Sequence, residues 1–288
     1  MAKRSLIAFA CILLLGAGAM FGVGEVLSTP YRHSVGPPPP ELFATPVLIP
    51  AGGGLVAGWV ARGAGSGAVL LLHAVRKDRR QMQDRALFLN RLGYSVLLID
   101  LQAHGESTGQ RVTFGALEAH GVKAALAYLK RNLPGERIGV IGVSLGAASA
   151  VLSQPGRSID ALVIEVMYPT IEEATANRMS MYLGPPGAWL APLMVAQIPL
   201  RTGVEPDQLR PIEAVKSLAS PVFVIGGTKD RHTPEAETRR IFAAAPEPKQ
   251  LWMVQEKGHE NFHEVVPPEY EKRVGAFLQQ YLRGDLLH

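Results

Sequence analysis

The chain has 288 residues, of which 47% are hydrophobic and 19% are charged, and its formal net charge is +4. This composition excludes a disordered chain, a coiled coil and a collagen-like protein, and so mild a charge predicts no nucleic-acid partner. The length suits two domains or one large α/β fold. The only cysteine, Cys11, lies near the N-terminus, so the body is expected to hold no disulfide and no cysteine-based metal site.

Residues 1–25 are predicted to be a signal-anchor or a signal peptide. Lys3 and Arg4 precede residues 5–24, which carry no charge. Twenty residues span roughly 30 Å as a helix, the hydrocarbon thickness of a bilayer. An uncleaved single-pass membrane anchor fits this run, and so does a signal peptide cut after Ala19. In both cases we expect the catalytic domain outside the cytoplasm, because the basic residues precede the apolar run.

The rest of the chain is expected to be a linker and one α/β domain. Residues 26–42 contain four consecutive prolines at 37–40, which favour an extended tether, and the folded domain should cover 43–288. Apolar runs predict eight strands at 46–49, 55–61, 68–73, 95–100, 137–142, 161–167, 221–226 and 250–254. Helical patterns lie between many of them, and this alternation predicts a mostly parallel sheet covered by helices.

Residues 169–211 interrupt the alternation and contain no clear strand. We interpret them as a small helical cap over the carboxyl ends of the strands. The alternative is ordinary additional core. Met179, Trp189 and Met194 are candidate lining residues of an apolar substrate pocket, since flexible apolar side chains suit such a surface.

The candidate nucleophile is Ser144, in the pattern G-x-S-x-G at residues 142–146. An apolar strand precedes the pattern and a run of small, helix-compatible residues follows it. A tight strand-to-helix turn needs small flanking residues, and it exposes the serine hydroxyl. The alternative is a buried serine in a glycine-rich turn.

A serine nucleophile needs a base, and the base needs an orienting carboxylate. Asp230 and His259 each follow an apolar strand by one short loop, where side chains from separate strands converge. Glu165, within a strand, is the reserve acid. The backbone N–H groups of Leu145 and Val75 are the expected oxyanion donors, with Arg76 as second choice to Val75.

These landmarks resemble the α/β-hydrolases, most closely the branch of monoacylglycerol lipases and serine aminopeptidase-like enzymes. The resemblance covers roughly residues 43–283 and rests on runs at 72–75, 100–107, 142–146, 227–230 and 258–259, which keep the family's order. It implies an α/β-hydrolase fold with a helical cap. It also implies that Ser144, Asp230 and His259 form the triad, and that His73 and His104 are structural. Ala74 and Ala103 replace glycines that are usual in the family.

Residues 259–263 also satisfy H-E-x-x-H, the pattern of zinc metalloproteases. That chemistry needs both histidines on one long helical face, whereas Gly258 precedes the pattern and two prolines soon follow it. The same residues make His263 the alternative base. We therefore predict a serine hydrolase that cleaves carboxylic esters, or short peptides or lipids, through an acyl-enzyme and without a cofactor or metal. A non-catalytic ligand-binding protein on the same scaffold, or a zinc metalloprotease, is the alternative.

The run at residues 76–80 places four positive charges against one negative charge beside the expected oxyanion loop. It is either a solvated loop or a surface that attracts anionic substrates or phospholipid headgroups.

Overall fold

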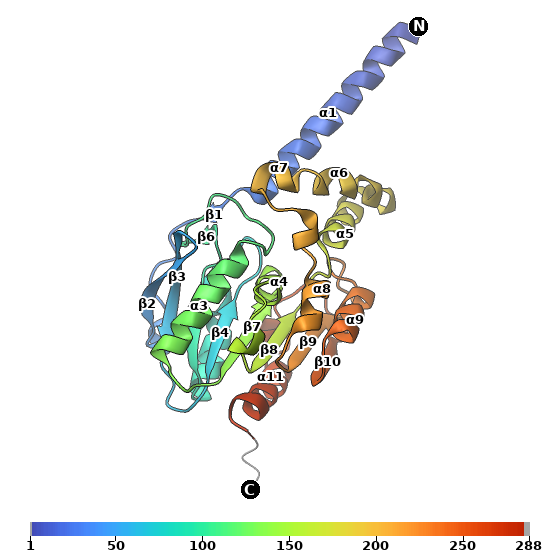
Figure 1. Ribbon diagram of the computed structural model, residues 1–288. Coiled ribbons are helices and arrows are strands. Elements are labelled where there is room, and N and C mark those ends of the chain that lie inside the picture. The colour runs from blue at the N-terminus through green and yellow to red at the C-terminus, as the bar shows by residue number, and fades with distance from the viewer. Residues whose placement is uncertain (1, 285–288) are drawn as a thin grey trace.

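The computed structural model describes residues 2–284, with side chains at Cys11 and from Leu14 onward. An eight-stranded sheet forms its centre, in the order β10-β9-β8-β7-β4-β5-β3-β2 (Figure 1). Strand β3 is antiparallel to β2 and to β5, and the other neighbours are parallel, which confirms the predicted α/β class. The strands are β2 (Thr45–Ala51), β3 (Gly54–Ala61), β4 (Ala68–Leu72), β5 (Ser95–Ile99), β7 (Ile138–Val143), β8 (Ala161–Glu165), β9 (Val222–Gly227) and β10 (Lys249–Val254).

Helices cover both faces of the sheet, which is why the central strands are apolar at nearly every position. In β4, Val69 and Leu71 face one core, and Leu70 and Leu72 face the other. Helices α3 (Glu118–Asn132), α4 (Leu145–Leu152), α8 (Pro211–Ala214) and α9 (Glu235–Ala244) contribute to one core. Helices α2 (Gln83–Arg91) and α11 (Pro267–Leu282) contribute to the other core. The single turn α10 (Phe262–Val265) contributes to it as well.

A helical segment between β8 and β9 lies beyond the carboxyl ends of the parallel strands (Figure 1). It contains α5 (Ile171–Leu183), η4 (Pro185–Leu190), α6 (Ala191–Val195), α7 (Ile198–Thr202) and η5 (Pro206–Gln208). A small core of its own, including Ile171, Val195 and Leu209, holds the segment together. Other short 3-10 turns are η1 (Pro40–Leu42), η2 (Arg79–Met82), η3 (Gly156–Ser158) and η6 (Val215–Ser217).

The N-terminus forms one helix, α1 (Ala2–Ser28), which projects from the body and contacts α6 and α7 at its C-terminal end (Figure 1). Among the residues that the structure describes, no helix combines the length and apolarity that crossing a membrane requires. The predicted single-pass anchor is therefore wrong, and the location outside the cytoplasm that was inferred from it is not retained. The apolarity of residues 5–24 does not reveal the polar contacts that hold the end of α1 to the body.

The segment that follows α1 also differs from the extended tether expected at residues 26–42. Strand β1 (Tyr31–Arg32) pairs in parallel with β6 (His104–Gly105). Val35 is buried, and its N–H donates to a Glu106 carboxylate oxygen at 3.0 Å. The strand pairing and buried Val35 before the prolines, and buried Leu42 after them, hold this segment against the body.

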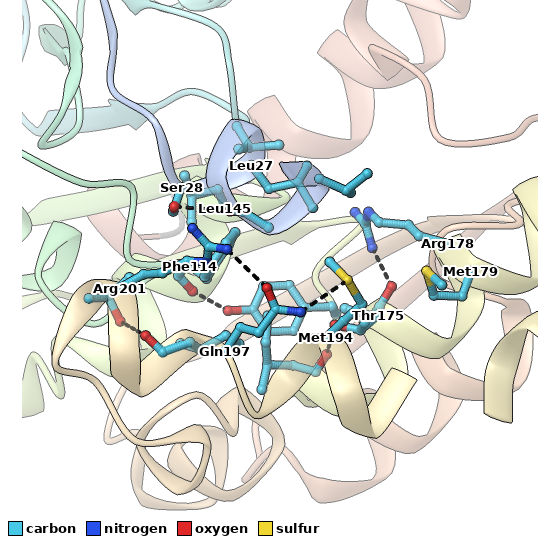
Figure 2. Close-up of a pocket in the computed structure, with 18 of the residues that line it drawn as sticks. Leu27, Ser28, Phe114, Leu145, Thr175, Arg178, Met179, Met194, Gln197 and Arg201 are labelled. Atoms are coloured by element: carbon cyan, nitrogen blue, oxygen red, sulfur yellow. Dashed lines mark hydrogen bonds between the residues drawn. The ribbon is translucent and has the colours of Figure 1, made fainter. Parts of the chain in front are cut away.

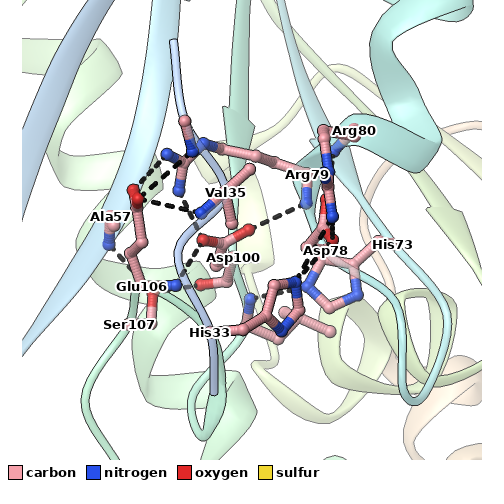
Figure 3. Close-up of polar contacts among 12 residues, drawn as sticks. His33, Val35, Ala57, His73, Asp78, Arg79, Arg80, Asp100, Glu106 and Ser107 are labelled. Atoms are coloured by element: carbon pink, nitrogen blue, oxygen red, sulfur yellow. Dashed lines mark hydrogen bonds and ion pairs between the residues drawn. The ribbon is translucent and has the colours of Figure 1, made fainter. Parts of the chain in front are cut away.

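The basic run at residues 76–80 is divided between surface and interior, because Arg76, Lys77 and Arg80 are exposed whereas Arg79 is not. Arg79 is buried and pairs with the carboxylates of Asp100 and Glu106 (Figure 3). Arg80 pairs with Asp78 at 2.7 Å, and Asp78 also accepts a hydrogen bond from the ring of His33 at 3.0 Å. These pairs tie the loop after β4 to β5 and to the segment after α1.

Candidate active site

Ser144 occupies the tight turn between β7 and α4. Its backbone φ is +51°, a conformation that is rare outside glycine and typical of strained functional turns. A Cβ at Gly142 would lie 2.6 Å from backbone atoms of Ala147, and a Cβ at Gly146 would lie 2.4 Å from the Leu72 carbonyl oxygen. The two glycines of the pattern are therefore required by close backbone approach.

The structure brings the side chains of Ser144, His259 and Asp230 together. His259 Nδ1 is 2.8 Å from Asp230 Oδ2, and His259 Nε2 is 3.3 Å from Ser144 Oγ. The other Asp230 oxygen accepts hydrogen bonds from the N–H groups of His232 and Thr233, at 2.7 and 3.0 Å. The carboxylate thus directs the His259 ring so that Nε2 faces the serine hydroxyl, and an arrangement of this kind can activate a serine.

His232 belongs to this site and was missed by the sequence analysis. Its ring lies 4.7 Å from the His259 ring, centroid to centroid, with 34° between the planes. Burial, and then the neighbouring His259, lower the pKa of His232 to about 4. The His232 ring therefore stays neutral at physiological pH. It packs against the His259 ring without placing a positive charge beside it. Its position two residues after Asp230 was the one available signal.

The two expected oxyanion donors line one cavity together with Ser144. The Ala74 N–H is occupied, since it donates to the side chain of Gln81 at 2.7 Å. Among the described residues, the N–H groups of Val75 and Leu145 have no protein acceptor. Leu145 is also the first residue of α4, so its N–H points to where negative charge is favourable.

Two cavities meet at Ser144. The first has a volume of about 270 Å³ and is lined mainly by apolar side chains, including Met179, Met194 and Tyr168 (Figure 2). The second, about 680 Å³, is polar, and Lys77, Asp84 and Glu260 lie along it with His259 and His232.

Trp189 does not line either cavity, in contrast to Met179 and Met194. It is 83% exposed, and Gly187 is the one residue of η4 that is buried. The prediction that Trp189 contributes to the pocket is therefore wrong.

Comparisons with known proteins identify the family. Residues 63–172 match the family model described as serine aminopeptidase, S33. The chain is 30% identical to protein Rv2307c of Mycobacterium tuberculosis over 267 residues, which cover 89% of this chain and 88% of the relative. The chain belongs to the α/β-hydrolases. This hydrolase is also 26% identical to YqkD of Bacillus subtilis, over 73% of its own length and 70% of the relative.

The solved structures agree with this assignment. The Pyrococcus furiosus esterase Pf2001 superposes with a TM-score of 0.76 at 27% identity, covering 89% of this chain and 98% of the esterase. The predicted fold is thus confirmed, and the protein is a serine hydrolase.

In this hydrolase, Glu165 is occupied by a buried ion pair. Arg85 donates to both carboxylate oxygens of Glu165, at 3.2 and 2.7 Å, and the Tyr270 hydroxyl donates to one of them at 2.6 Å. Arg85 also donates to Asn261, two residues beyond His259, at 2.7 Å. The Glu165 carbonyl accepts the Ser144 N–H at 2.8 Å. Glu165 is therefore unsuited to be the reserve acid, and the buried pair instead links the serine turn to the histidine loop.

The two histidines of the H-E-x-x-H pattern have separate surroundings. His259 precedes α10, whereas His263 lies within it, and α10 is a single turn. His263 Nε2 is 3.0 Å from a Glu271 carboxylate oxygen on α11. The two rings do not share the long helical face on which the zincin arrangement depends.

Arg178 on α5 is a cation that lines both cavities (Figure 2). Its Nη1 donates to the Ala174 carbonyl at 2.9 Å, and among the described residues it has no carboxylate within ion-pair distance. Burial lowers the pKa of Arg178 from its ordinary value, with no ion pair to offset the cost of desolvation.

The two histidines that the resemblance assigned to structural roles are buried beneath the site. His73 Nδ1 donates to the Ala74 carbonyl at 2.7 Å, and Nε2 accepts the Leu101 N–H at 2.9 Å. This pair of bonds requires the neutral imidazole. Burial lowers the pKa of His73 to about 4 and that of His104 to about 3.

Proposed function

We propose that this hydrolase cleaves carboxylic esters through a Ser144–His259–Asp230 triad and an acyl-enzyme. The observation that carries the proposal is the continuous chain of contacts from Asp230 through His259 to Ser144, at the point where an apolar and a polar cavity meet.

In the proposed mechanism, His259 Nε2 accepts the Ser144 proton while Ser144 Oγ attacks the ester carbonyl. Asp230 holds the proton on His259 Nδ1 and stabilises the imidazolium that forms. The N–H groups of Val75 and Leu145 stabilise the oxyanion. His259 then donates its proton to the departing alcohol, and the same residues activate the water that hydrolyses the acyl-enzyme.

The cavities support a division of the substrate into two ends. The acyl chain occupies the apolar cavity beside Met179 and Met194, and the polar groove beside His259 receives the leaving group. We propose that residues 169–211 act as a cap within a hydrolase domain covering 43–288. The last four residues lie outside the described part of the chain.

Labelling with a fluorophosphonate, together with a series of p-nitrophenyl esters, tests the proposal. Ser144→Ala should abolish labelling and lower kcat by about 10⁴ or more while the thermal midpoint stays near that of the wild type. Labelling that persists in Ser144→Ala would assign the nucleophile elsewhere.

The dependence of kcat/KM on acyl-chain length tests whether the apolar cavity beside Met194 binds the substrate. Each methylene that enters the apolar cavity should raise kcat/KM about fourfold, from about 0.8 kcal/mol of burial, until the cavity is full. Met194→Ala should flatten this rise, and Trp189→Ala, an exposed residue of the same segment, is the matched control. Equal slopes in both variants would mean that Met194 is core.

The family model is named for a serine aminopeptidase and the Pyrococcus relative is an esterase, so the two reactions should be compared directly. We expect p-nitrophenyl esters to exceed amino-acid p-nitroanilides in kcat/KM. Faster turnover of the anilides would make this enzyme a peptidase.

A further inference from the structure

The C-terminal end of α1 lies against the proposed active site. Val23, Gly24, Leu27 and Ser28 line the apolar cavity that also contains Ser144. Val23 and Leu27 are four residues apart and therefore share one face of the helix. Figure 2 shows the end of α1, with Leu27, at the cavity that Met194 and Gln197 of the helical segment also line.

An ion-pair clamp fixes this end of α1. The Glu25 carboxylate pairs with Arg111 from the body and with Arg201 from α7. These two arginines lower the pKa of Glu25, with the Arg111 hydrogen bond as the largest cause. Arg201 also donates to the Phe21 carbonyl at 2.6 Å, and its guanidinium lies 4.1 Å from the centroid of the Phe21 ring.

Backbone contacts hold the same turns to the loops of the site. Arg76, which follows the expected oxyanion donor, donates to the Val26 carbonyl at 2.9 Å. The Ser28 carbonyl accepts the Val112 N–H at 2.9 Å, and Ser28 is buried. The end of α1 is thus held by the body on one side and by the cap on the other.

Gly24 of α1 lies close to the side chains of Gln197 and Arg201. A Cβ at Gly24 would lie 2.8 Å from the side-chain oxygen of Gln197 and 3.1 Å from Arg201 Nε. The end of α1 is therefore in close contact with α7 and the residue before it, through side chains that would have to move to admit a larger residue at position 24.

We propose that the last two turns of α1, residues 21–28, form the wall of the acyl pocket and set the longest acyl chain that this enzyme accepts, with Glu25 as the positioning residue. This inference rests on the proposed ester hydrolysis. Its substrate class is an ester of a straight apolar acid whose chain runs from Ser144 toward Leu27. Residues far from the hydrolase motifs in sequence thereby determine specificity.

Variants of Leu27 in the full-length chain test the wall directly, with p-nitrophenyl esters from acetate to long acyl chains. Leu27→Trp should fill the pocket and lower kcat/KM for the longest esters at least tenfold more than it lowers kcat/KM for the acetate. Leu27→Ala should move the preferred chain to greater length. Leu14→Trp is the matched control, because Leu14 lies on the same helix, is 73% exposed and does not line either cavity.

Glu25→Gln tests the clamp. It keeps the size of the side chain and removes the charge that both arginines contact. The fall in kcat/KM beyond the longest accepted acyl chain should therefore become less steep, while acetate turnover stays unchanged. A thermal midpoint measured for each variant separates an altered pocket from an unfolded protein, and Leu27→Ala remains informative if the larger Trp does not fold.

The outcomes distinguish the two proposals. An unchanged chain-length profile in both Leu27 variants, with fluorophosphonate labelling that still depends on Ser144, would refute the role of α1 in the acyl pocket. The proposed triad would be unaffected. Labelling of the wild type that does not depend on Ser144 would overturn the proposed function and this inference with it.

Discussion

Replacing Asp230 with Asn should disable the enzyme through the tautomer of His259 and leave the fold in place. One Asp230 oxygen accepts the N–H groups of His232 and Thr233, and the other accepts from His259 Nδ1. An asparagine keeps the two backbone bonds only if its carbonyl oxygen faces His232 and Thr233. Its NH₂ group then faces His259.

An amide donor at that position requires His259 Nδ1 to be an acceptor. The proton of the neutral ring then moves to Nε2, the nitrogen that lies 3.3 Å from Ser144 Oγ. A protonated Nε2 cannot take the serine proton. The same replacement of aspartate by asparagine in a serine protease triad lowers kcat about 10⁴-fold, which corresponds to about 5.5 kcal/mol in activation free energy.

The assay is kcat for p-nitrophenyl acetate, measured beside the thermal midpoint. Asp230→Asn should lose about four orders of magnitude with a midpoint close to the wild type, because both backbone hydrogen bonds survive. Asp230→Ala should lose comparable activity and also stability, since two buried N–H groups lose their acceptor. Activity of Asp230→Asn within tenfold of the wild type would refute the assignment of Asp230 as the orienting acid.

Three further outcomes follow from the packing and charges around the site. Gly146→Ala should destabilise the protein by about 1–3 kcal/mol, because its Cβ meets a backbone carbonyl of β4, whereas Gly18→Ala, with open space around it inside α1, should not lower stability in urea unfolding. Arg178→Met should keep or raise the thermal midpoint, since it removes a half-buried charge that has no ion-pair partner among the described residues, and a lower midpoint would contradict that cost. His73 and His104 have lowered pKa values in the folded state, so their stabilisation is complete above about pH 6.5 and falls by about 1.4 kcal/mol per group and pH unit toward pH 4. Unfolding free energies that stay constant between pH 6.5 and pH 5 would contradict the last expectation.

Much of the fold could be predicted because the relevant signals are local. Each central strand is buried on both faces, so its run is almost entirely apolar, and all eight predicted strands lie within two residues of their observed bounds. The serine turn was equally visible, since the collisions that a side chain at Gly142 or Gly146 would meet involve backbone atoms that any sequence of this fold presents. Patterns of this kind depend on neighbours along the chain or on the backbone alone.

The errors arose where the decisive partner is distant in sequence. Glu25 pairs with Arg111 and Arg201, which lie 86 and 176 residues away, so nothing within residues 1–28 indicates a docked helix. Val35 was likewise assigned to a tether, although its amide binds Glu106. The burial of Arg79 within the basic run was hidden for the same reason, because the two carboxylates that pair with it, those of Asp100 and Glu106, follow β5 in the chain.

These distant contacts also explain why the site is larger than its motifs. The motifs place a serine, a histidine and an aspartate at one edge of the sheet, and that edge alone is an open surface. The apolar cavity exists only because the helical segment approaches from one side and α1 from the other, with Arg201 joining the two through Glu25. A relative that kept residues 142–146 and 258–259 but lost the acidic residue at position 25 should therefore retain the chemistry with a different acyl preference. The chain-length profile of such a relative, compared with that of Glu25→Gln, would show whether specificity depends on the clamp or on the motifs.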